Sequence, residues 1–137
     1  MIIVDTNVLS ELTRPNPEPR VLRWLSEQPV DAMVTTAVTM AELLCGVRKM
    51  ADGKRKAAMA GVIAAILEQF AGRILPFDER AAEKYALIVA SRERIGRPIQ
   101  PLDAQVASIA AARGAALASR DRDMRDCGVP LLNPWDA

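Results

Sequence analysis

Short apolar runs alternate along the chain with longer stretches of mixed polarity. The first run, at residues 2–4, is continuous and β-branched, as in a strand buried on both faces. Four further runs predict strands, at residues 32–35, 73–77, 115–119 and 129–132. Pro76 restricts the third strand to a sheet edge or to the last position of the strand.

The stretches between these runs carry helix signals. A first helix is expected to end near Leu12, before a segment broken by prolines, and Thr36 suits the cap of a later helix. Asp78 and Pro101 are typical of helix starts, and Gly72 and Gly114 of helix ends. Further helices are predicted over residues 21–25, 38–47, 57–70, 79–95 and 102–113.

Strands that alternate with helical segments of this length predict βαβ units with right-handed crossovers. We therefore expect an α/β fold with three layers, in which helices cover both faces of a central, mostly parallel sheet. Neither a linker nor a repeat interrupts the 137 residues, so residues 1–137 are expected to form one domain. The longest apolar stretch falls short of the ~18 to 20 residues that a membrane span requires.

The composition narrows the possible chemistry. The chain has no histidine, which excludes histidine-based nucleophilic triads, histidine general bases and histidine-ligated zinc. Cys45 and Cys127 lie far apart, which favours a reduced, cytoplasmic setting over a disulfide framework. A net charge of +1 means that any contact with nucleic acid must be local.

Two acids follow predicted strands, and a third lies on a helix. Asp5 and Asp121 stand where strands end, which is where ligands gather in parallel sheets, although each also suits a helix cap. Glu42 shares a helix face with Val38, Cys45 and Gly46, and we expect this face to be buried. A buried carboxylate requires a proton, an arginine partner or a cation.

A fourth acid, Asp103, lies in the first turn of its helix, on the apolar side. Compensation of the helix dipole is its ordinary explanation. One bound divalent cation, however, accounts for Asp5, Glu42, Asp103 and Asp121 together. Oxygen ligands without histidine or thiolate suit Mg²⁺ or Mn²⁺. We expect such a cation to stabilise the fold.

Several motifs resemble a known family when they are taken in order. They are Ile-Val-Asp5-Thr-Asn, Ala41-Glu42-Leu, Asp103 in Leu-Asp-Ala-Gln-Val-Ala, Ala-Ser-Arg-Asp121 and Asn133-Pro134-Trp135. Over the whole chain they resemble PIN domains, most of all VapC-type toxins of type II toxin–antitoxin systems, including the FitB-like branch. The resemblance implies a metal-dependent endoribonuclease with Asp5, Glu42, Asp103 and Asp121 in its pocket, usually a homodimer, with a small antitoxin as its partner.

The resemblance also assigns supporting residues. Asp121 stands where relatives often carry Asn, and Asp123 could share its role. Ser119 stands where Thr is common, and its hydroxyl could bond to a ligand carboxylate. Thr6 and Asn7 are expected to support the site in the same way.

The absence of histidine favours hydrolysis by a metal-activated water, which predicts 5′-phosphate and 3′-hydroxyl products. Arg120, Arg122 and Arg125 are predicted to bind RNA phosphates, with ion pairs to Asp123 and Asp126 as the alternative. Aromatic residues are few, so recognition is expected to depend on RNA shape and backbone. Arg92, at the end of its helix, is expected to compensate the helix dipole.

Three other classes of protein remain as alternatives. A PIN-like module could bind RNA or a partner without cutting it. A receiver-like domain shares the sheet and the acids but gives no reason for Glu42. A haloacid-dehalogenase-like phosphatase requires a second acid two residues after the first, where this chain has Asn7.

Overall fold

A computed structural model describes residues 1–137 and contains one five-stranded sheet in the order β3-β2-β1-β4-β5. All four neighbouring strand pairs are parallel. The strands are β1 (Ile2–Val4), β2 (Met33–Thr36), β3 (Ile74–Leu75), β4 (Ala116–Ala118) and β5 (Leu131–Leu132). The predicted α/β fold is confirmed, and its sheet is parallel throughout.

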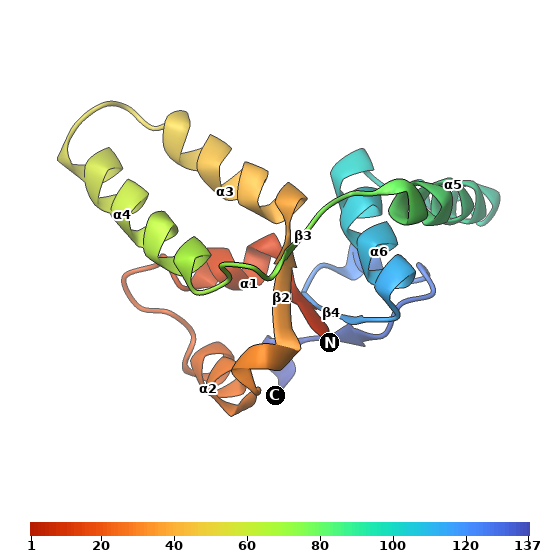
Figure 1. Ribbon diagram of the computed structural model, residues 1–137, viewed down its shortest axis with the longest axis horizontal. Helices are drawn as coiled ribbons and strands as arrows, with labels where there is room; N and C mark the ends of the chain where they lie inside the picture. Colours follow the sequence, from red (N-terminus) through yellow and green to blue (C-terminus); the bar gives the residue numbers. More distant parts are fainter.

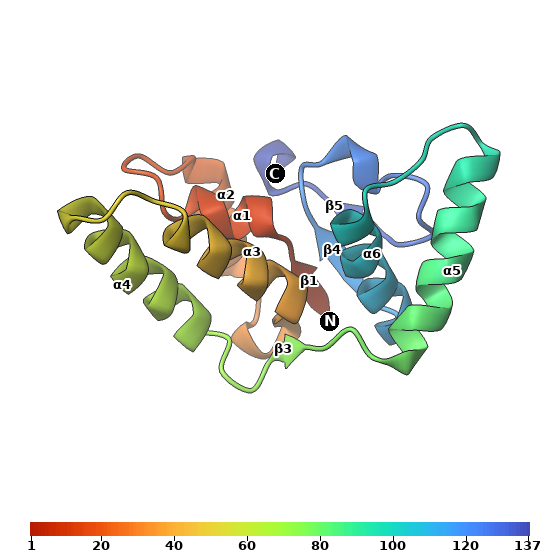
Figure 2. The same cartoon turned by 90° about the horizontal axis from the view of Figure 1, so that it is seen from above.

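Helices cover both faces of this sheet, as Figures 1 and 2 show. One layer contains α1 (Thr6–Glu11), α2 (Pro19–Glu27), α3 (Ala37–Arg48) and α4 (Lys54–Glu68). The other contains α5 (Glu79–Arg94) and α6 (Pro101–Arg113). Three short 3-10 helices complete the chain: η1 (Val30–Ala32), η2 (Arg122–Met124) and η3 (Pro134–Asp136). No helix combines the length and the hydropathy that a bilayer span needs.

The first strand shows why its sequence is continuously apolar. Ile3 and Val4 are fully buried but belong to different clusters, because successive side chains of a strand point to opposite faces. Ile3 packs in the cluster that includes Val106 of α6, and Val4 packs in the cluster that includes Val8 of α1. Burial on both faces therefore explains the absence of polar residues in β1.

The strand order reverses between β1 and β4. From β1 the chain crosses to β2 and β3 on one side of the sheet, and β4 and β5 lie on the other side. Val4 and Ala118 are paired in register, and the Asp5 amide donates a hydrogen bond to the Ala118 carbonyl at 3.0 Å. The exits of β1 and β4 are therefore adjacent, at the kind of crevice where α/β proteins bind ligands.

Some predicted boundaries are wrong by a few residues. Helix α4 begins at Lys54, three residues before its predicted start, because Gly53 adopts a φ of 144° and ends the preceding turn. Strand β3 stops at Leu75, immediately before Pro76, which has no N–H to donate to a neighbouring strand.

Arg92 has a different role from the predicted dipole compensation. Its side chain is only 1% exposed, and its Nε donates to the Arg97 carbonyl at 2.7 Å. Its Nη1 donates to the carbonyls of Asp123 at 2.6 Å and Arg125 at 3.0 Å. Arg92 therefore ties the end of α5 to the loop that follows Asp121.

We expect the substitution Arg92→Met to lower the free energy of unfolding by about 3 kcal/mol or more, because each buried carbonyl left without a donor costs ~1 to 3 kcal/mol. Arg94→Met is the control, since Arg94 is exposed near the same helix end. Urea unfolding measures both variants. Equal, small losses in the two variants would show that the buried guanidinium does not hold this loop.

Candidate functional site

Asp5 lies where β1 ends and α1 begins, and its side chain is only 5% exposed. Its Oδ1 accepts a hydrogen bond from the Thr6 amide at 2.8 Å, so the predicted helix cap is present. Its Oδ2 accepts from the Ser119 hydroxyl at 2.8 Å and from Asn7 Nδ2 at 3.3 Å. The Asp5 carboxylate therefore caps α1 through one oxygen and bonds to Ser119 and Asn7 through the other, and these bonds hold it in one orientation.

Ser119 and Asn7 join the exits of β1 and β4. Asn7 Nδ2 donates to the Ser119 hydroxyl at 2.7 Å, and the Asp121 amide donates to the same oxygen at 3.1 Å. Asn7 Oδ1 accepts from the Arg120 amide at 3.3 Å. Both residues thus bond to Asp5, and their supporting role at a metal site stays a prediction.

Glu42 reaches the same region from α3. Its Oε1 accepts a hydrogen bond from the Thr6 hydroxyl at 2.8 Å, which gives Thr6 its predicted supporting contact. The predicted buried face is correct only at Val38, because Cys45 and Gly46 are exposed and Glu42 itself is half-buried. Glu42 has no arginine partner, since its hydrogen bond comes from a hydroxyl.

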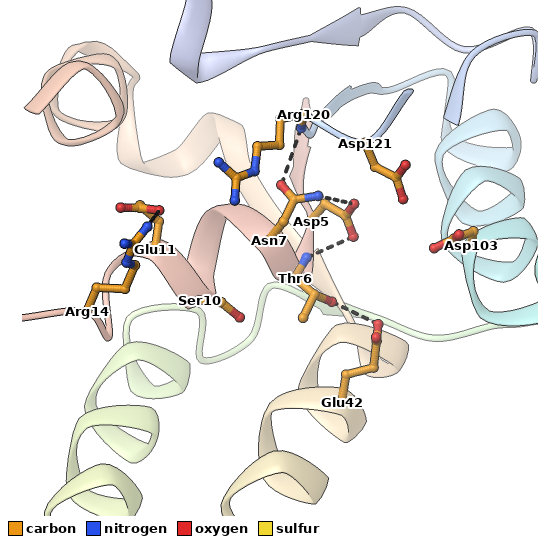
Figure 3. Close-up of a pocket in the computed structure, with 10 residues that line it drawn as sticks. All are labelled: Asp5, Thr6, Asn7, Ser10, Glu11, Arg14, Glu42, Asp103, Arg120 and Asp121. Carbon is orange, nitrogen blue, oxygen red and sulfur yellow. Dashed lines mark hydrogen bonds and ion pairs between the residues drawn. The ribbon is translucent and has the colours of Figure 1, made fainter. Parts of the chain in front are cut away.

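The other two acids come from the far side of the sheet. Asp103 lies in the first turn of α6, and Asp121 caps η2 by accepting a hydrogen bond from the Asp123 amide at 2.9 Å. Both acids line one cavity of about 480 Å³ together with Asp5 and Glu42, and no hydrophobic residue lines it. Figure 3 shows the four carboxylates around this space, with Asp103 on the opposite side from Asp5. Asp123 does not line the cavity.

The electrostatics show that these acids repel one another. Burial raises the pKa of Asp103 to about 6, with further contributions from Asp121, Asp5, Glu42 and Asp123. Burial also raises the pKa of Asp5, as do Glu42 and Asp121, against the hydrogen bonds from Ser119 and Thr6. An unpaired acidic cluster of this kind favours a proton or a cation.

The donor set suits a hard divalent cation, because it consists of carboxylate oxygens with hydroxyl and amide support. With the side chains in the positions described, no three acids lie close enough to hold one ion. Mg²⁺ takes only one or two carboxylates directly and keeps several waters, so the other acids can hold it through bound water. The residues therefore fit a magnesium or manganese site in their chemistry.

We expect Asp103→Asn to stabilise the metal-free protein at pH 7. The folded-state pKa of about 6 exceeds the ordinary value of 3.8, so stability falls as the pH rises from about 4 through 6. The variant lacks this pH-dependent loss of stability. It should therefore melt at a higher temperature than the parent protein above pH 6, with little difference in melting temperature below pH 4. Thermal melts in EDTA measure it, with exposed Glu93→Gln as the control. A lower melting temperature at pH 7 would contradict the repulsion.

Glu11, Ser10 and Arg14 also line the cavity, and sequence reasoning missed them. Glu11 is buried and accepts hydrogen bonds from the Glu18 amide at 2.9 Å and from Arg14 Nη1 at 3.3 Å. These bonds, first that from Glu18, lower the pKa of the Glu11 carboxyl. Glu11 could have been predicted to line the cavity, because it lies four residues after Asn7 on the same helix face.

The three predicted RNA-binding arginines have different positions. Arg120 lines the cavity, and its guanidinium carbon lies 4.4 Å from the centre of the Trp135 ring. Arg122 and Arg125 are exposed and lie outside the cavity. None of the three forms the alternative ion pair: Asp126 is paired with Arg97, and Asp123 is in no ion pair.

Fold and site together define a class: a three-layer α/β protein with an acid-lined pocket at the carboxyl edge of a parallel sheet. A family model described as "PIN domain" matches residues 2–129. The chain therefore belongs to the PIN-domain family, as its motifs predicted.

Similar proteins match the chain over almost its whole length. "VapC ribonuclease Y4jK" of Sinorhizobium fredii is 36% identical to this chain, and the alignment covers 99% of each of the two chains. "Toxin FitB" of Neisseria gonorrhoeae is 39% identical over 98% of this chain and 99% of its own. The crystal structure of FitAcB from Neisseria gonorrhoeae superposes with a TM-score of 0.94 at 38% identity, with all of both chains covered.

Proposed function

We propose that this protein is a metal-dependent endoribonuclease toxin that a cognate antitoxin inhibits. The observation that carries the proposal is the convergence of Asp5, Glu42, Asp103 and Asp121, from four separate segments, on one cavity without apolar lining. The relative named as a VapC ribonuclease supports RNA as the substrate, and the relative named as a toxin supports the biological class.

The four acids would hold Mg²⁺ or Mn²⁺. When bound, such a cation activates a water molecule and neutralises charge on the scissile phosphate. Asp5 is the pre-oriented ligand, because Ser119, Asn7 and the Thr6 amide fix its two oxygens. The Thr6 hydroxyl orients Glu42 toward the same space.

The antitoxin and a second copy of the chain are the proposed protein partners. Solved structures of relatives include FitAB bound to a DNA fragment, which supports an antitoxin partner. For the homodimer, the support is an apolar hollow of about 690 Å³ beside the acidic cavity, lined in part by Val38, Phe77 and Leu102. A monomer by light scattering at micromolar concentration would contradict the dimer. We place the protein in the cytoplasm, where RNA and reduced thiols occur.

Cleavage of total RNA by the purified protein tests the enzymatic proposal. We expect cuts that require Mg²⁺ or Mn²⁺ and leave 5′-phosphate and 3′-hydroxyl ends, since water attacks the phosphorus. A 2′,3′-cyclic phosphate would show attack by the ribose hydroxyl and would reject this route. Binding of RNA without any cleavage would favour the non-catalytic PIN-like module.

A further inference from the structure

A second polar hollow, of about 560 Å³, adjoins the acidic cavity. The two hollows share Glu11, Arg14 and Arg120, so they form one continuous trough. The four acids line one end of this trough, and Trp135 and the loop at residues 15–19 line the other. Figure 3 shows Arg14 and Glu11 on the opposite side of Asp5 from Asp103.

Two guanidinium groups, of Arg14 and Arg120, and one carboxylate, of Glu11, line the junction of the two hollows, and the far end adds the carboxylate of Glu18. Arg14 Nη1 lies 3.3 Å from Glu11 Oε1, and Arg120 lines both hollows together with this pair. Glu11 is already bonded to the Glu18 amide and to Arg14. The Arg14 side chain is 62% exposed, and Arg120 is exposed, so both can meet an anion from solvent.

A flat, fixed surface lies beside these charges. Arg120 stacks on the Trp135 ring, and the Trp135 amide donates to Asn133 Oδ1 at 3.0 Å. The carbonyl of Trp135 accepts from Arg20 Nη1 at 3.4 Å. Three prolines stiffen the loop at residues 15–19 on the facing wall. A planar base can stack on such a surface at little ordering cost.

We propose that this trough binds the RNA strand next to the bond that is cut. Arg14 and Arg120 bind the neighbouring phosphate, and the stacked pair of Arg120 and Trp135 supports its base. This assignment rests on the proposed function. RNA is favoured over an acidic protein segment because the trough begins at the acidic cavity and combines paired guanidiniums with a stacking surface, which match a phosphate followed by a base.

Tryptophan fluorescence tests the stacking. In the background Asp5→Asn with Trp24→Phe, Trp135 is the only tryptophan and RNA is not cut. Titration with a short single-stranded RNA is expected to quench its fluorescence to saturation. Loss of one phosphate contact in Arg14→Gln should raise the Kd about tenfold, whereas Arg94→Gln, which is exposed on α5, should change it less than about twofold.

A set of RNAs in which one linkage at a time is an uncharged methylphosphonate tests the phosphate contact. We expect the methylphosphonate at one linkage beside the cut to weaken binding by about the same factor as Arg14→Gln. Arg14→Gln combined with this modified RNA should weaken binding little more than either change alone. Additive losses at every linkage, or no quenching of Trp135, would overturn the assignment while leaving cleavage by the parent protein intact. Stronger quenching and tighter binding by an acidic peptide would assign the trough to a protein segment. Absence of cleavage by the parent protein would instead reject the proposed function, because these binding measurements do not depend on it.

Discussion

Asp5→Asn is expected to reduce the rate of RNA cleavage by at least about a thousandfold, because it removes the best-oriented charge of the acidic cavity. Asparagine has the same shape and is also a good helix cap, so the bond to the Thr6 amide can persist. Among the four converging acids, only Asp5 has protein donors on both carboxylate oxygens, so none of the other three can take its place without losing these contacts.

Single-turnover cleavage of a defined RNA measures this loss, with circular dichroism to verify the fold. Asp31→Asn is the matched control, because Asp31 is exposed and lies outside the cavity. It should cleave at the parent rate. Equal cleavage by Asp5→Asn and the parent protein would point to a contaminating nuclease or to a site elsewhere in the fold.

Removal of divalent cations should have an effect of similar size. Chelation with EDTA is expected to slow cleavage by at least about a hundredfold, and Mg²⁺ or Mn²⁺ should restore it. The Asp103→Asn variant should need a higher metal concentration for half-maximal rate, because it lacks one of the carboxylates proposed to hold the ion. A rate at saturating metal equal to that of the parent protein would show that this variant only binds metal more weakly. A lower rate would show that Asp103 also contributes to the reaction.

The measurement is the cleavage rate across a metal titration, in the parent protein and in Asp103→Asn. Glu93→Gln again serves as the control, because it removes an exposed negative charge away from the cavity. Full activity in EDTA would contradict a metal-dependent reaction. Identical metal curves for the parent and Asp103→Asn would remove Asp103 from the ligand set.

Local signals were sufficient to predict much of the fold. Thr36 caps α3 through the Thr39 amide, Asp78 caps α5 through the Ala81 amide, and Gly114 ends α6 with a φ of 60°. Strand β1 was predictable because its run of apolar residues is typical of a strand buried on both faces. The place of Asp5 in the cavity was predictable because its position at a strand exit is local information.

The residues that were misjudged depend on contacts between distant segments. The 3.6-residue period placed Glu42 on a face with Cys45 and Gly46, but only Val38 of that face is buried, so the period alone could not show where the rim of the cavity lies. Arg92 is held by carbonyls about thirty residues away, which no helix signal reveals.

Direct binding of Mn²⁺ to the RNA-free protein is the sharpest test of the acidic cavity as a metal site. Calorimetric titration is expected to show saturable binding to the parent protein, with binding at least about tenfold weaker in both Asp5→Asn and Asp103→Asn and unchanged in Asp31→Asn. Binding that all four proteins share equally, or no binding at millimolar Mn²⁺, would contradict the convergence of these carboxylates on a cation.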